Sequence, residues 1–386
     1  MQIHAKRALS VLLSVAMVLS MMVGFLTFTV TTGAVEAEQE GVKSVQVSLD
    51  GKSETTLNAD NPSVNAGSGT ISFDAATGTV TLTNATAKYL YSPKEDYGLL
   101  TVVLVGESTL SGYQSKNSYT LRGYNGMTVR GTGTLHVTAG NMYTVGTITN
   151  DLCFEGDVTV DITAVQDAIH QGQDADVNGK KDGCIYFKDN ANVSVTTTGS
   201  GWGIRSQQND GSMYFEDDCT VTVNAAKGIY AQEQVDGSTG DLWFRGGTVS
   251  VTANNGYGIQ SSRDYGNMYF DGGQVTVSSS TSVAINAEQY YGNMYFRGDA
   301  RVIATGTKNH AIWAQHKWGG SVYVEDSAYV KATCNAKDQN WKMALKCTSF
   351  VQTGGEVELS ANGTTAGLVA LGVYGACDLS LRRKRI

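Results

Sequence analysis

The chain has 386 residues, a net charge of −8 at pH 7, 45 glycines and only two prolines. The acidic balance argues against nucleic acid and against an anionic membrane surface as partners, because both would repel it. The many glycines, together with abundant Thr, Val, Ser and Asn, are typical of short strands joined by tight turns.

The N-terminal segment has the pattern of an export signal. Lys6 and Arg7 form a short basic start, an apolar run follows over 8–30, and small residues offer a cleavage site after Ala37. The apolar run is long enough to span a bilayer if it is never cleaved. We therefore expect residues 1–37 to be a signal peptide that directs the protein to secretion or the cell surface. An uncleaved N-terminal membrane anchor is the alternative.

Residues 38–125 contain extended segments of irregular length, including 69–73 and 99–105. These segments have strand composition but no fixed repeat. We expect this region to form an N-terminal cap and the first irregular rungs of the domain that follows.

Residues 126–386 repeat a phrase of an apolar residue, an aromatic residue, Phe and a charge. Clear copies begin at steps of 26–29 residues, at Ile185, Met213, Leu242, Met268, Met294 and Val322. Each copy is followed by a Val-x-Val segment, such as 221–223, and then by an Ile-centred segment, such as 228–231. All three segments alternate apolar and polar residues with period two, which predicts three short strands per repeat.

Strands of this kind cannot bury their apolar faces within one repeat, so successive repeats must stack. The sequence therefore predicts an all-β fold, a right-handed parallel β-helix, with interior columns of Met or Leu, Phe, Val and Ile. A β-propeller would need longer repeats of about 40–50 residues with four strands. The stretch from Leu368 to Cys377 matches the spacing of a further rung, so we expect the helix to end in a partial rung.

The charge that follows the Phe alternates in sign over seven repeats, at Glu155, Lys188, Glu216, Arg245, Asp271, Arg297 and Glu325. Stacked strands would place these side chains about 4.7–4.9 Å apart, where opposite charges attract. We interpret the pattern as a ladder that fixes the register of the repeats, and not as a catalytic array.

Two sets of aromatic residues are candidates for binding carbohydrate. The first is the outward position of the repeated phrase, which includes Trp243, Tyr269 and Tyr295. The second set lies in the turns, with Tyr265, Tyr291 and Trp318 at one corner and Trp202, Tyr257 and Trp341 at another. The first set also fits a stack that only stabilises the sheet. The turn residues are the better binding candidates, because loops usually carry function.

One insertion resembles the opening of a calcium-binding loop. Oxygen ligands alternate at Asp174, Asp176 and Asn178, with the carbonyl of Lys180 and the carboxylate of Asp182 completing the candidate set. The acid expected at position 12 of such a loop is replaced by Ile185, and a solvated loop without metal is the alternative.

Other chemistry has weaker support in the sequence. The six cysteines show no CxxC spacing, and we expect them to fill the core more often than to form bridges. The histidines His136, His170, His310 and His316 match no triad or metal spacing. Asp217 and Asp218 lie at a turn, so we do not expect a glycosidase acid pair there.

The segments 69–74, 78–82 and 127–135 resemble a family of exported bacterial carbohydrate-binding right-handed parallel β-helices. The resemblance covers roughly residues 42–380, and it implies a shape like that of polysaccharide lyases. It also implies that the ligand is a polysaccharide, since some members bind acidic pectic polymers with calcium. No lyase signature carries over, because Pro62 and Pro93 lack the flanking arginines of an Arg-x-Pro-x-x-Arg motif.

These observations predict a non-catalytic polysaccharide-binding protein, secreted or at the cell surface, with calcium as its candidate cofactor. A β-helix polysaccharide lyase or glycoside hydrolase is the first alternative. A structural surface adhesin without a sugar preference is the second.

Overall fold

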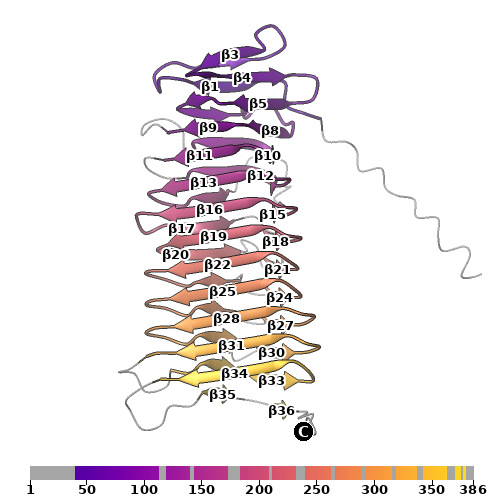
Figure 1. Cartoon of the computed structure of the whole chain (residues 1–386), viewed down its shortest axis with the longest axis vertical. Coiled ribbons are helices and arrows are strands. Elements are labelled where there is room, and N and C mark those ends of the chain that lie inside the picture. The colour runs from indigo at the N-terminus through magenta and orange to yellow at the C-terminus, as the bar shows by residue number, and fades with distance from the viewer. Residues whose placement is uncertain are drawn as a thin grey trace, which may run out of the picture. The chain divides into compact units, whose positions relative to one another are not determined.

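The structure is a computed structural model, which describes residues 40–112, 119–139, 143–172, 183–207, 211–231, 240–261, 266–287, 292–314, 319–336, 342–362, 370–374 and 377–379. These residues belong to one compact unit, Glu40–Ile386. They form strands and no helix, stacked as a parallel β-solenoid of about 9 turns (Figure 1). The prediction of an all-β parallel β-helix is thus confirmed. The expected signal peptide, 1–37, lies outside the described residues, and within those residues no helix has the length and apolarity needed to cross a membrane.

The N-terminal end of the solenoid consists of antiparallel strands. β3 (Ser63–Ala66), β4 (Gly69–Asp74) and β5 (Thr79–Thr83) form a meander. β1 (Val45–Ser48) pairs antiparallel with β2 (Thr55–Leu57) and with β7 (Tyr89–Tyr91). Parallel pairing begins where β5 meets β8 (Leu100–Val105). The meander lies at the end of the stack in Figure 1, where it covers the first parallel rung.

Every later rung contributes one strand to each of three parallel ladders. Ladder 1 holds the repeated phrase: β15 (Ile185–Phe187), β18 (Met213–Phe215), β21 (Leu242–Phe244), β24 (Met268–Phe270), β27 (Met294–Phe296), β30 (Ser321–Val324), β33 (Ser349–Gln352) and β36 (Cys377–Leu379). Ladder 2 is the 11-stranded sheet: β6 (Thr86–Ala87), β9 (Glu107–Leu110), β11 (Thr134–Thr138), β13 (Thr159–Ala164), β16 (Asn192–Thr197), β19 (Thr220–Ala225), β22 (Thr248–Ala253), β25 (Gln274–Ser279), β28 (Arg301–Gly306), β31 (Tyr329–Cys334) and β34 (Glu356–Ala361).

Ladder 3 holds the Ile-centred strands: β14 (Ile169–Gln171), β17 (Trp202–Ser206), β20 (Lys227–Ala231), β23 (Ile259–Gln260), β26 (Ile285–Asn286), β29 (Ile312–Ala314), β32 (Leu345–Cys347) and β35 (Leu371–Val373). Two long strands, β10 (Leu121–Gly131) and β12 (Val145–Phe154), run through both ladder 1 and ladder 3. They join these two ladders into one 25-stranded sheet.

The interior of the solenoid contains the predicted columns. The phenylalanines of the phrase are fully buried and stack with ring centroids 4.8–5.3 Å apart, at Phe154, Phe187, Phe215, Phe244, Phe270 and Phe296. Val324 takes the equivalent place in the next rung. The single interior Phe column that the repeat predicts is therefore confirmed. Five cysteines of the described strands and turns, Cys153, Cys184, Cys219, Cys334 and Cys347, are free thiols. All of them except Cys184 are buried, in agreement with their expected packing role.

A polar ladder that the sequence analysis did not predict runs just before the strands of ladder 1. The side-chain oxygen of one rung accepts the backbone N–H of the next rung, at Asp151–Cys184, Ser212–Asp241, Asp241–Asn267, Asn267–Asn293 and Asn293–Ser321, over 2.7–3.1 Å. The sequence signal for it is a glycine and a polar residue directly before the phrase, as in Gly266-Asn267 and Gly292-Asn293. These bonds satisfy N–H groups that the parallel ladder leaves open.

Replacing Asn293 by alanine is expected to cost about 1–3 kcal/mol of unfolding free energy, because the part-buried N–H of Ser321 loses its acceptor. Asn293→Asp keeps the accepting oxygen and should cost less. Amide hydrogen exchange at Ser321 reports the effect directly: we expect faster exchange in N293A and near-wild-type exchange in N293D. The same protection in both variants would contradict this role.

Candidate glycan-binding surface

The aromatic residues of the repeated phrase form a column on the outer face of ladder 1. We call this column the phrase row, and it consists of Tyr186, Tyr214, Trp243, Tyr269, Tyr295 and Tyr323. Each side chain is half-buried between two inward neighbours, as the strand alternation predicts. Successive rings stack with interplanar angles of 5–11° and centroid separations of 3.7–6.4 Å.

This stacking decides what the phrase row presents to a ligand. Each ring face packs against the ring of the neighbouring rung, so the ring edges are left for contacts from outside. The hydroxyls of Tyr214, Tyr269 and Tyr295 are hydrogen-bonded to the side chains of Ser212, Asn267 and Asn293. Burial raises the pKa of Tyr214, Tyr269 and Tyr295, and these hydroxyls therefore remain protonated donors at neutral pH. The row offers a periodic strip of hydrogen-bonding edges, and its rings also stabilise one another.

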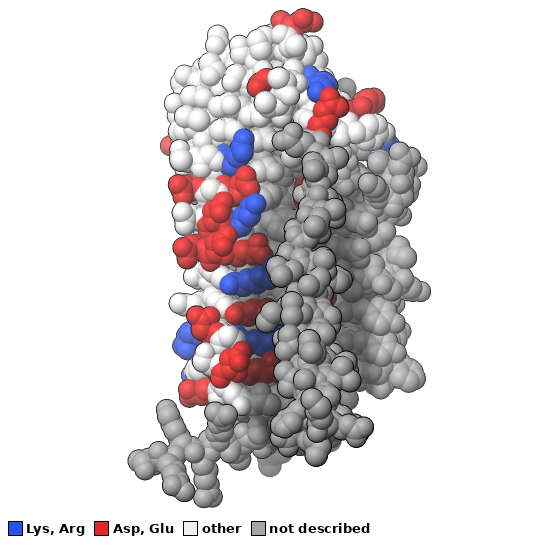
Figure 2. Space-filling view, turned by 90° about the vertical axis from the view of Figure 1, so that its right-hand side faces the viewer, with Lys and Arg blue, Asp and Glu red and all other residues white. Residues whose placement is uncertain are grey.

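The alternating charges lie beside the phrase row. Figure 2 shows acidic and basic side chains alternating down one face. Three ion pairs connect neighbouring rungs: Lys188–Glu155 at 2.9 Å, Arg245–Glu216 at 2.7 Å and Arg297–Asp271 at 2.7 Å. In each pair the cation contacts the carboxylate of the preceding rung, and hydrogen bonding to that carboxylate raises the pKa of Lys188 and of Arg297.

The arginines connect the charges to the aromatic column. The Arg245 guanidinium lies 4.5 Å from the ring centroid of Trp243, and that of Arg297 lies 5.4 Å from the ring centroid of Tyr295. Contacts of this kind contribute roughly 0.5–1 kcal/mol at exposed sites. The charges and the phrase row therefore form one continuous surface whose side chains hold one another in place.

Two of the predicted turn aromatics lie within the described residues, and both are at the entry to ladder 3. Trp202 is only 8% exposed, its ring stacks on Tyr230 at 4.8 Å, and Lys227 Nζ lies 5.5 Å from the Trp202 ring centroid. The Trp202 backbone N–H donates to Oδ1 of the buried Asp167 over 2.7 Å. Tyr257 is half-buried in the rung after Lys227. The other turn candidates, Tyr265, Tyr291, Trp318 and Trp341, lie outside the described residues.

The candidate calcium ligands Asp174, Asp176, Asn178, Lys180 and Asp182 also lie outside the described residues, so calcium binding remains a prediction. Within the part of the chain that the structure describes, no group of three or more His, Cys, Asp and Glu side chains is arranged to hold a metal ion.

A buried polar cluster surrounds His170 on β14. The Tyr119 hydroxyl lies 2.6 Å from Nδ1 of His170, whose Nε2 lies 2.6 Å from Oε1 of Gln207, and the ring of Tyr143 stacks on the imidazole at 3.7 Å. Since Oε1 of Gln207 can only accept, Nε2 carries the proton and Nδ1 accepts from Tyr119. Burial lowers the pKa of His170, which favours this neutral form. The cluster is a closed set of hydrogen bonds.

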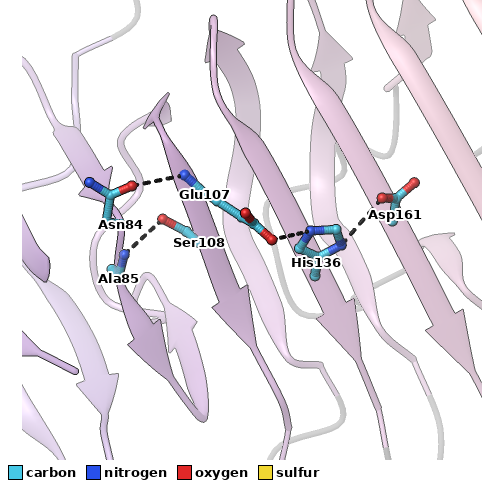
Figure 3. A network of polar contacts seen from close by, with 6 residues as sticks. All are labelled: Asn84, Ala85, Glu107, Ser108, His136 and Asp161. Atoms are coloured by element: carbon cyan, nitrogen blue, oxygen red, sulfur yellow. Dashed lines mark hydrogen bonds and ion pairs between the residues drawn. The ribbon is translucent and has the colours of Figure 1, made fainter. Parts of the chain in front are cut away.

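A second histidine network lies on the exposed face of ladder 2 (Figure 3). His136 on β11 contacts Glu107 on β9 through Nε2 and Asp161 on β13 through Nδ1, each at 3.2 Å. The Glu107 backbone N–H in turn donates to Oδ1 of Asn84. The imidazole thus connects two carboxylates, one from the rung before its own and one from the rung after it, a juxtaposition that the sequence analysis did not predict.

No family model, no curated protein and no solved structure matches this chain. The parallel β-solenoid agrees with the fold that the resemblance implies. Export and carbohydrate binding remain expectations.

Proposed function

We propose that this protein binds polysaccharide without catalysis, as a secreted or cell-surface protein. The observation that carries the proposal is the phrase row, in which half-buried aromatic side chains occupy one position of six successive rungs. A surface that repeats at every rung suits a ligand that itself repeats. The tyrosine hydroxyls, together with the neighbouring carboxylates and guanidinium groups, supply donors and acceptors for sugar hydroxyls.

A second surface in the proposal lies at the entry to ladder 3, where Trp202 is the first residue of β17 and Tyr257 precedes β23. The cluster of Trp202, Tyr230 and Lys227 combines aromatic rings with a cation at the entry to ladder 3. Calcium held by the loop over 174–182 is included in the proposal as a cofactor that would bridge the acidic protein and an acidic glycan.

A glycan microarray with and without EDTA tests the proposal, using the full secreted chain. We expect the wild-type protein to retain at least one polymeric glycan, and the double variant Trp243→Ala, Tyr269→Ala to lose about tenfold or more in affinity for it. Tyr329→Ala is a matched control, because Tyr329 is a half-buried aromatic residue on the outer face of ladder 2.

The outcomes separate the alternatives. Retention that disappears in EDTA would support the calcium loop, and no retention under either condition would contradict polysaccharide binding. Release of unsaturated uronides or reducing ends from a retained polymer would favour a lyase or a hydrolase.

A structural surface adhesin is the second candidate, and one observation favours it. The ring faces of the phrase row are occupied by neighbouring rings, as in a stack that only stiffens the sheet. Binding to protein surfaces in the absence of any glycan binding would support this function instead.

A further inference from the structure

Arg122 on β10 holds a positive charge in a partly buried site lined by tyrosines. Its register partner on β7 is Tyr91, whose ring centroid lies 4.9 Å from the guanidinium carbon, and the Tyr124 ring lies at 5.9 Å. Lys94 Nζ lies 5.8 Å from the same Tyr124 ring, so two cations flank it. We call these four residues the Arg122 cluster.

One donor of Arg122, the N–H at Nε, has no acceptor within the described chain. Its Nε is fully buried and has no hydrogen-bond partner there, and its side chain forms no ion pair with any described carboxylate. Burial lowers the pKa of the Arg122 guanidinium, and only tyrosines act in the opposite direction. A buried charged donor without an acceptor destabilises the folded protein, and a bound anion would supply the missing acceptor.

A partly buried arginine without a carboxylate partner is unusual in this solenoid, as a comparison with other arginines shows. Arg245 and Arg297 each contact a carboxylate at 2.7 Å, and Arg205 contacts Asp167 at 3.5 Å. Arg301 also lies on a tyrosine ring, that of Tyr329, but it is exposed to solvent. The chain carries 36 acidic residues against 28 basic ones, so a shortage of carboxylates does not explain the unpaired Arg122.

We propose that the Arg122 cluster binds the carboxylate group of a small organic acid or sugar acid. A guanidinium presents a planar fork of donors that matches a carboxylate in a bidentate arrangement. The contacts with Tyr91 and Tyr124 hold this fork in place before the ligand arrives, which reduces the ordering cost of binding. The site lies in the first rungs, on strands other than those of the phrase row. This proposal therefore does not depend on the polysaccharide binding proposed above.

Isothermal titration calorimetry of the full chain tests the assignment, with glucuronate as the probe and glucose as its neutral counterpart. We expect saturable binding of glucuronate and none of glucose. Arg122→Gln removes the charge and keeps a shorter polar side chain, and it should weaken glucuronate binding by about tenfold or more, whereas Arg122→Lys should retain part of it. Arg301→Gln, which removes an exposed arginine that lies on a tyrosine, should bind as the wild type does.

Three results would overturn the proposal: equal glucuronate affinity in R122Q and wild type, equal binding of glucose, or no binding of glucuronate at all. Tighter binding of inorganic sulfate or phosphate would overturn the choice of a carboxylate. If R122Q does not fold, the comparison of R122K with the wild type decides. Variants of the phrase row should keep glucuronate binding, which separates failure of this site from failure of polysaccharide binding.

Discussion

Replacing Phe244 by alanine is expected to cost about 3–5 kcal/mol of unfolding free energy, the range for a fully buried aromatic side chain. The Phe244 ring lies between those of Phe215 and Phe270, at 4.8 Å from each. The parallel ladders β18–β21 and β21–β24 fix the spacing of the rungs, so the backbone cannot close the cavity. The loss therefore includes both the transfer of the ring and the empty volume it leaves.

Urea unfolding measures the effect, and native-state hydrogen exchange locates it, because stacked repeats need not unfold in one step. Phe244→Leu should cost less than Phe244→Ala, since it leaves a smaller cavity. Thr252→Ala, at an exposed position of β22, is the control and should change stability by about 0.5 kcal/mol or less. A loss for F244A no larger than that of the control would show that the Phe column is not a source of stability.

The folded protein is expected to lose stability as the pH falls from about 6.5 to about 4, in part through His310. This residue is buried, and its Nδ1 accepts the N–H of Met343 over 2.8 Å. Burial, and then the positive charges of Lys346 and Lys342, lower the pKa of His310 from 6.5 to about 4. Between these values the unfolded chain takes up a proton that the folded chain excludes, so the stability falls by about 3 kcal/mol. Burial shifts the pKa of His170 in the same direction.

The comparison of wild type with His310→Gln, each unfolded by urea at several pH values, isolates this contribution. The stability difference between the two proteins should shrink as the pH falls, because only the wild type has an imidazole to protonate at this position. Lys346→Gln should make the loss smaller, since it removes one of the charges that oppose protonation. Parallel stability curves for wild type and H310Q would contradict the assignment.

The repeat made much of the fold predictable. Alternation with period two shows which side of each strand is apolar, and the step of 26–29 residues shows which residues stack. The column from Phe154 to Phe296 follows from these two facts. The alternating charges predicted attraction between neighbouring rungs, and the ion pair of Arg245 with Glu216 is one example. The polar ladder at Asn267 and Asn293 carried a visible signal, the glycine and polar residue before each phrase.

The candidate sites were less predictable, because their contacts depend on side-chain direction and on segments without a repeat. The sequence identified the aromatic positions of the phrase row but not the stacking that occupies their ring faces. Arg122 and Tyr91 lie where the strands are irregular, so no spacing indicated that they would be neighbours. The contacts of His136 with Glu107 and Asp161 were also not predicted, because they depend on the directions of the three side chains.

The sequence by itself determined the solenoid and the division of its side chains into interior and exterior. This is because strand alternation and stacking of equal repeats are properties of neighbouring residues and of the repeat length. Only the tertiary structure decided which exterior groups became partners. Arg245 and Arg122 both occupy outward positions, but Arg245 forms an ion pair with Glu216 whereas Arg122 lies on the ring of Tyr91. The partner differs because it is supplied by the neighbouring rung. The unpaired charge of Arg122 is thus a property of the assembled rungs.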